Sequence, residues 1–169
     1  QEKIYGEITG RIKQDDSSVP YRERGYWYYT RFEPGKDYPV YARRKGTMDA
    51  PEEIMLDGNV MAAGKGFFQI GDWAISQDNK LLAYAEDTSG RRQYVVRVKN
   101  LETGETYADA ITNVEANLVW ADDNRTLMYI EKDPVTLLSK RVKSHVLGSA
   151  ADSDKLVYEE KDDSFYVSI

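Results

Sequence analysis

The sequence contains no cysteine, a single histidine and only five prolines in 169 residues. The absence of cysteine excludes disulfides and thiolate metal sites and is compatible with a reducing compartment. Our expectation for location is the cytoplasm. A periplasmic location stays open, because a chain that starts at Gln1 rather than Met is compatible with a removed upstream segment.

Long apolar runs and an excess of positive charge are also missing. No segment approaches the roughly 18–20 continuous apolar residues that a membrane-spanning helix requires. The 23 basic and 29 acidic residues give a net charge of −6, which argues against a non-specific nucleic-acid binder, because phosphate contacts need clustered Lys and Arg. We expect neither a membrane nor a nucleic-acid partner.

The residues of a serine-nucleophile site are incomplete. There is no Gly-x-Ser-x-Gly segment, the elbow that presents such a serine. His145 is the only candidate for an imidazole base, and it lies in a predicted strand beside Lys143 and Ser144. We interpret His145 as a structural or surface residue.

The acidic runs predict solvated turns. Residues 159–163 (EEKDD) and the pair Asp122-Asp123 could in principle bind calcium or hydrolyse glycosides. Neither run has the Asp-x-Asp-x-Asp-Gly pattern of a dedicated calcium loop. A glycosidase would also need inward-facing acids from several repeats, so this function ranks last.

The basic clusters are Arg43-Arg44-Lys45 and Arg91-Arg92. Each holds few charges, so we assign them to a rim that faces solvent or another domain rather than to an anion site. Ser76-Gln77-Asp78 begins like the Ser-x-Asp box of sialidase propellers, but the Gly, Thr and Trp of that box are absent. The sequence thus predicts no catalytic, cofactor-binding or metal-binding residue and no cofactor.

A repeat is the strongest positive signal. Residues 73–84 (WAISQDNKLLAY) and 120–129 (WADDNRTLMY) share a Trp that closes an apolar strand, an Asp-Asn turn, and a second apolar strand that ends in Tyr. The two Trp are 47 residues apart and the two Tyr 45. A recurrence of this length is typical of the four-stranded blade of a β-propeller.

The rest of the chain supplies the other strands. Residues 1–16 predict a short helix with an apolar stripe, weakened by two glycines. The predicted blades comprise strands 19–22, 26–31, 38–44 and 53–56, then 69–76, 81–86, 93–100 and 105–109, then 117–121, 126–131, 139–147 and 155–158, with 165–169 as the inner strand of a fourth. We therefore predict an all-β fold, a partial β-propeller of about three four-stranded blades plus one strand. Its domains are a helix and linker over 1–18 and the propeller part over 19–169.

Several long runs resemble a known family. They are GRIKQDDSSVPYRERGYWYYTRF (10–32), YPVYARRKG (38–46), LLAYAEDTSGRRQY (81–94), VWADDNRTLMYIEKDPVTLLSKRVKSHVLG (119–148) and VYEEKDDSFYVSI (157–169). Together they are similar, collinearly and over nearly the whole chain, to the N-terminal propeller of the oligopeptidase B branch of the prolyl oligopeptidase family of serine peptidases.

The resemblance implies a seven-bladed propeller that covers an α/β-hydrolase domain and admits only short peptides, cleaved after Arg or Lys. In that family the Ser-Asp-His triad lies in the hydrolase domain, which is absent from these residues, so no catalytic role passes to His145 or any other position. The implied partners are that C-terminal hydrolase domain and short peptide substrates. The alternative is a stand-alone propeller that serves as a protein-interaction module. We also expect self-association through two exposed blade edges, at the first blade and at residues 165–169.

Overall fold

A computed structural model describes all 169 residues, which form two compact units, Gln1–Ala63 and Gly64–Ile169. The first unit holds a four-stranded sheet and the second a seven-stranded sheet, both antiparallel throughout. Neither helix of the structure has the length and apolar character needed to cross a membrane.

The first unit confirms the predicted first blade. After helix α1 (Glu2–Thr9), strands β1 (Tyr21–Glu23), β2 (Tyr26–Arg31), β3 (Val40–Lys45) and β4 (Glu52–Asp57) pair in chain order, and helix α2 (Gly58–Ala62) follows. Aromatic and β-branched residues dominate β2 and favour a strand. Its core is formed by Tyr28, Val40, Ala42, Met55 and Leu56.

Helix α1 is shorter than the predicted span of 1–16. It ends at Thr9, and none of its residues is buried. Gly6 and Gly10 cost helix stability, and no packing within the unit offsets that cost. The predicted apolar stripe is therefore open to solvent, with Ile4, Tyr5, Ile8 and Ile12 all more than half exposed.

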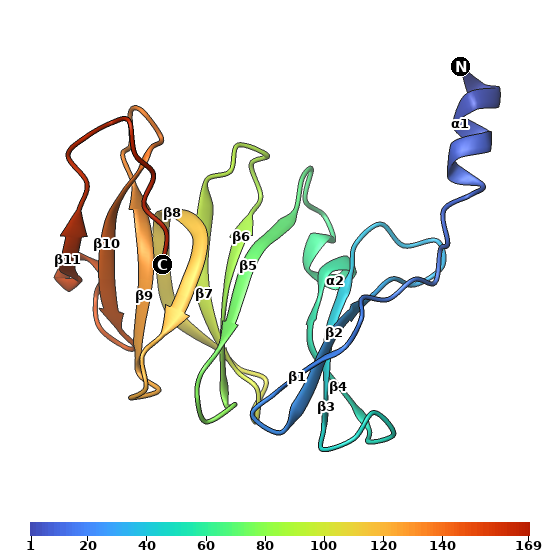
Figure 1. Cartoon of the computed structure of the whole chain (residues 1–169), viewed down its shortest axis with the longest axis horizontal. Helices are drawn as coiled ribbons and strands as arrows, with labels where there is room; N and C mark the ends of the chain where they lie inside the picture. The colour runs from blue at the N-terminus through green and yellow to red at the C-terminus, as the bar shows by residue number, and fades with distance from the viewer. The chain divides into compact units, whose positions relative to one another are not determined.

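The second unit is a meander in which each strand lies beside the next (Figure 1). Its elements are β5 (Gln69–Ile75), β6 (Leu81–Asp87), β7 (Tyr94–Asn100), β8 (Thr106–Trp120), β9 (Thr126–Lys132), β10 (Ser139–Val146), the 3₁₀ turn η1 (Ala151–Ser153) and β11 (Lys155–Glu159).

Strand β8 corrects the prediction of separate strands at 105–109 and 117–121. Its first part pairs with β7, as in Val96 opposite Ile111, and its last part pairs with β9, as in Trp120 opposite Leu127. The change of partner occurs near Asn113, which has a φ of 59°, a conformation that asparagine tolerates. One 15-residue strand thus closes one blade and opens the next.

The strand register also corrects the alignment of the repeat. Trp73 pairs with Tyr84 as Leu118 pairs with Tyr129. The structural repeat is therefore 45 residues across the first two strands of each blade, and Trp120 is equivalent to Ile75 rather than to Trp73. A shift of two residues keeps a side chain on the same face of a strand, which is why the sequence pattern remained visible.

The core of the second unit joins its two blades. Small residues of β6 share one buried cluster with large residues of β8 and β9; its members include Leu81, Ala83, Ala85, Val96, Val98, Leu118, Trp120, Leu127 and Tyr129. Small side chains on one blade leave space for the indole of Trp120 on the next.

The predicted strand at 165–169 does not form. These residues have no regular secondary structure, because no neighbouring strand of the chain offers them a backbone ladder. Ile169 is instead held by the side chain of Asn117 on β8, at 2.8 and 2.9 Å.

Candidate functional site

The most enclosed polar cluster surrounds His145 on β10. The imidazole is 1% exposed. Its Nδ1 lies 2.8 Å from Oδ1 of Asp154 and its Nε2 lies 2.9 Å from Oδ1 of Asp109. The hydroxyl of Tyr129 donates to Asp154 and the backbone N–H of Gly148 donates to Asp109. Together these contacts tie β10 to β8, β9 and the end of η1.

A pocket of about 400 Å³ opens beside this cluster, and Ser149 is among its lining residues. The set of serine, histidine and aspartate resembles a triad only in composition. A general base needs one ring nitrogen directed at the nucleophile, whereas both nitrogens of His145 face carboxylates. The hydroxyl of Ser149 donates to the carbonyl of Val146 instead. The arrangement fits the structural role predicted for His145.

Burial and hydrogen bonding oppose each other in this cluster. Burial alone would raise the pKa of Asp109, but donation from His145 and from the N–H of Gly148 holds that pKa below its usual range. Burial and the hydrogen bond to Asp154 raise the pKa of Tyr129. Sequence reasoning missed Asp109 and Asp154, since they lie 36 and 9 residues from His145 and belong to no motif.

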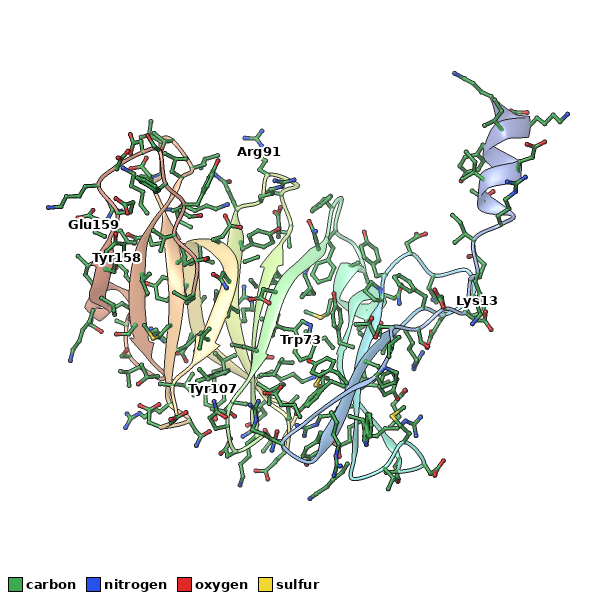
Figure 2. The ribbon with its side chains drawn as sticks, viewed as in Figure 1. Lys13, Trp73, Arg91, Tyr107, Tyr158 and Glu159 are labelled. Atoms are coloured by element: carbon green, nitrogen blue, oxygen red, sulfur yellow. The ribbon has the colours of Figure 1, made fainter.

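The loop between β6 and β7 presents Arg91 and Arg92. The carboxylate of Asp87, 1% exposed, accepts hydrogen bonds from the N–H groups of Ser89, Gly90 and Arg92 and from the hydroxyl of Ser89. Figure 2 shows Arg91 at the outer end of this loop, directed away from the sheet. The pair therefore projects into solvent from a well-ordered turn, as predicted.

Lys132 anchors the same loop from the next blade. Its Nζ, almost fully buried, donates to the carbonyl of Arg92 at 2.7 Å and lies 2.8 Å from Oε2 of Glu115. Sequence reasoning missed Lys132, because an isolated lysine at a strand end looks like an ordinary surface residue.

Two residues of the basic cluster in the first unit, Arg43 and Arg44, make contacts within its sheet, whereas Lys45 is exposed. Arg43 is 3% exposed, pairs with Glu53 at 2.8 Å and stacks over the ring of Tyr26. Arg44 donates to the hydroxyl of Tyr29 at 2.8 Å. These two arginines thus brace β3 against its neighbours, a correction to their assignment as a rim.

The acidic runs are engaged locally. Asp123 accepts from the N–H groups of Arg125 and Thr126 and so closes its own turn. Glu159 pairs with Arg141 at 2.8 Å and Asp163 pairs with Lys140. Such contacts are those of solvated turns and edge-strand pairs, in agreement with the prediction.

Ser76 also has a local role. Its buried hydroxyl donates to Asp78 at 2.6 Å and accepts from the N–H of Leu81 at 2.9 Å. The pair stabilises the β5–β6 turn, in which Asn79 has a φ of 63°.

Comparisons with known proteins agree with this architecture. Residues 1–169 match the family described as prolyl oligopeptidase, N-terminal beta-propeller domain. The whole chain is 58% identical to dipeptidyl aminopeptidase BI of Pseudoxanthomonas mexicana, and 99% of it is 31% identical to protease 2 of Moraxella lacunata. The chain spans 25% of the length of each.

Solved structures give the same result. Oligopeptidase B from Leishmania major superimposes with a TM-score of 0.89 and 33% identity, over 95% of this chain and 23% of that one. Oligopeptidase B from Trypanosoma brucei, solved with covalently bound antipain, gives a TM-score of 0.86 and 30% identity over the same shares. The blades described above are therefore part of a propeller, and the chain belongs to the prolyl oligopeptidase family, as its N-terminal β-propeller domain.

Proposed function

We propose that the whole protein is a serine peptidase of short peptides, and that these residues are part of the propeller that limits access to a catalytic domain elsewhere in the chain. The observation that carries the proposal is the family match over all 169 residues, together with 58% identity to a peptidase four times as long. Cytoplasmic location belongs to the same proposal.

In this proposal residues 1–169 are not catalytic by themselves. The engagement of both nitrogens of His145 by carboxylates supports this role. The exposed apolar stripe of α1, with Ile4, Tyr5 and Ile8, suits a helix that packs against the catalytic domain of the parent protein.

For specificity we propose cleavage after Arg or Lys, as in the oligopeptidase B branch. One observation favours a second candidate: the relative with 58% identity is named a dipeptidyl aminopeptidase. A peptidase of that kind requires a free N-terminus two residues before the scissile bond.

The test compares two reporter amides, an N-terminally blocked Arg-Arg amide and a free Gly-Arg amide, with the whole protein and with residues 1–169. We expect the whole protein to cleave both, and a serine-directed acylating inhibitor to abolish both activities. Cleavage of the free dipeptide amide alone would favour dipeptide release. Activity in residues 1–169 alone would overturn the proposal.

The alternative is a propeller that acts as a protein-interaction module without a hydrolase. The reading frame of the parent decides between them. Continuation through further blades into a Gly-x-Ser-x-Gly segment supports the peptidase, and a frame that closes the ring and stops supports the module.

A further inference from the structure

A polar side chain recurs at one position of two successive inner strands. Asp72 on β5 and Asn117 on β8 are 45 residues apart, which is the repeat set by the strand registers. Their equivalence therefore follows from backbone pairing and does not depend on similarity of sequence.

Asp72 joins its inner strand to the next one. Its Oδ2 accepts the backbone N–H of Leu118 at 2.8 Å. Two more hydrogen bonds link residues with the same separation of 46: the indole N–H of Trp120 donates to the carbonyl of Ala74, and the N–H of Asp78 donates to Oδ1 of Asn124. One register thus runs along the whole seam between the two blades.

Asn117 makes the corresponding contact one blade later. Its Oδ1 accepts the N–H of Ile169 at 2.8 Å, and its Nδ2 donates to the carbonyl of the same residue at 2.9 Å. Figure 1 places the C-terminus beside β8 accordingly. Asn117 therefore binds the backbone of Ile169 in the way that Asp72 binds the backbone of Leu118, although residues 165–169 form no strand.

The sheet face that carries Val119, Met128 and Val142 is equivalent to the face of the preceding blade that is covered by β8 and β9. Ala74, Ala83 and Val96 are covered in the core of the second unit, and their equivalents by strand pairing are Val119, Met128 and Val142. Val119 is 41% exposed. Met128 and Val142 line a pocket of about 470 Å³ together with residues of β11 and of the segment 166–169.

We propose that Asp72 and Asn117 are register clamps that bind the backbone of the following inner strand, and that Asn117 with its open face is the docking site for the next blade. That blade begins with residues 165–169 and continues in the parent chain beyond Ile169. This inference rests on the proposed assignment of the chain to a longer propeller protein.

Three observations favour this occupant over a second copy of the chain. The first residues of the next blade are already seated on the clamp. The site continues an interface that the second unit has formed once. A covalently attached segment also binds at a high effective concentration that a second molecule does not reach at ordinary dilution.

Amide hydrogen exchange tests the clamps in the 169-residue chain. We expect the amide of Ile169 to exchange about five- to tenfold more slowly than in a synthetic peptide of residues 160–169, as one hydrogen bond provides. Asn117→Ala should remove that protection alone, and Asp72→Ala should remove that of Leu118 alone. Asn124→Gly, the matched control, removes the acceptor at a position whose φ of 55° glycine adopts freely, and it should affect Asp78 only. Exchange of Ile169 at the peptide rate, or protection that survives Asn117→Ala, would overturn the clamp.

Methionine oxidation by peroxide tests the occupant. Met128 should oxidise more slowly in the whole protein than in residues 1–169, while Met55, 1% exposed, reports any general unfolding. Equal oxidation of Met128 in both would refute the docking site, and protection that grows with the concentration of the short chain would identify a second copy as its occupant. Neither readout uses hydrolysis, so failure here is separable from failure of the peptidase proposal.

Discussion

At the scale of single residues, His145 is a buried side chain that contacts two carboxylates. Its imidazole lies between two carboxylates whose side chains are 8% and 1% exposed, those of Asp109 and Asp154. Each ring nitrogen lies within hydrogen-bond distance of one carboxylate oxygen, at 2.8 Å for Asp154 and 2.9 Å for Asp109. Removal of the ring leaves buried carboxylates without their shared donor, and this is costly in a region of low dielectric.

We expect His145→Leu to lower the free energy of unfolding by about 3–5 kcal/mol, measured by urea denaturation at pH 7. Lys143→Leu, on the same strand, removes a pair with Glu131 in which both side chains are 23% exposed, and it should cost less than about 1 kcal/mol, because Arg141 still pairs with Glu131. The difference in unfolding free energy between the His145→Leu and Lys143→Leu variants should become smaller toward pH 3. The pKa of Asp109 is lowered by folding, so the stability it provides is present above its unfolded pKa and is lost as the pH falls. A loss no larger than that of the lysine variant would contradict the role assigned to His145.

Asp72 should respond to pH in the opposite sense. Burial raises its pKa, against hydrogen bonds from the backbone of Leu118 and Trp73. An acid with a raised pKa in the folded state contributes its stability below the unfolded pKa, near 3.9, and loses it as the pH rises. Asp72→Asn keeps an acceptor for Leu118 and avoids the charge. We therefore expect a more stable protein at pH 7, with no gain at pH 3, in urea titrations.

The exposed turn residue Asp122 provides the control for that experiment. Asp122→Asn should leave stability unchanged at both pH values. A loss of stability for Asp72→Asn at pH 7 would mean that the charge itself, rather than the acceptor oxygen, holds the seam.

At the scale of elements, the approach of β5 to β8 depends on a glycine. A Cβ on Gly71 would lie 2.4 Å from Cε1 of Tyr94 and 2.6 Å from Cβ of Ala116. We expect Gly71→Ala to cost about 1–3 kcal/mol by urea denaturation, because both neighbours are packed. Gly66→Ala, where a Cβ meets nothing within 4 Å, should be nearly neutral. Equal effects of the two would show that β5 and β8 separate readily.

The same scale explains what the sequence could predict. Strands were predictable because apolar runs and Asp-Asn turns are local signals, and both occur where β6 and β9 begin. The fusion of two predicted strands into β8 was not predictable, since it depends on pairing with β7 and β9 at once. The partners of His145 likewise come from β8 and from the end of η1, and no local pattern connects them.

The predicted strand at 165–169 failed for the converse reason. Its composition favours a strand, but a strand also needs a neighbouring backbone to pair with, and here the side chain of Asn117, rather than a strand, binds the backbone of Ile169. Helix α1 shows the same limit. Its apolar spacing was correctly identified, but no residue of α1 is buried, so no packing within the unit extends the helix to the predicted length.

At the scale of the whole molecule, each unit presents an unpaired edge strand. All three residues of β1 are exposed, as are Leu156, Val157 and Tyr158 of β11; Figure 2 shows Tyr158 and Glu159 at the free end of the second sheet. Exposed edges with apolar side chains favour pairing with another chain. Each chain has a net charge of −6, so two chains repel each other. Dissolved salt screens this repulsion and limits it to short distances.

We therefore expect residues 1–169 to self-associate with rising concentration, measured as weight-average mass by light scattering, and more strongly at high salt. Leu156→Lys places a charge on the β11 edge and should shift the association to higher concentration by roughly tenfold, the equivalent of about 1.4 kcal/mol. Val135→Lys is the matched control, because Val135 is 88% exposed but lies in the β9–β10 loop, where no backbone edge is available. A monodisperse monomer at all concentrations would show that local charge already protects both edges. An equal response to the two lysine variants would assign the association to net charge rather than to strand pairing.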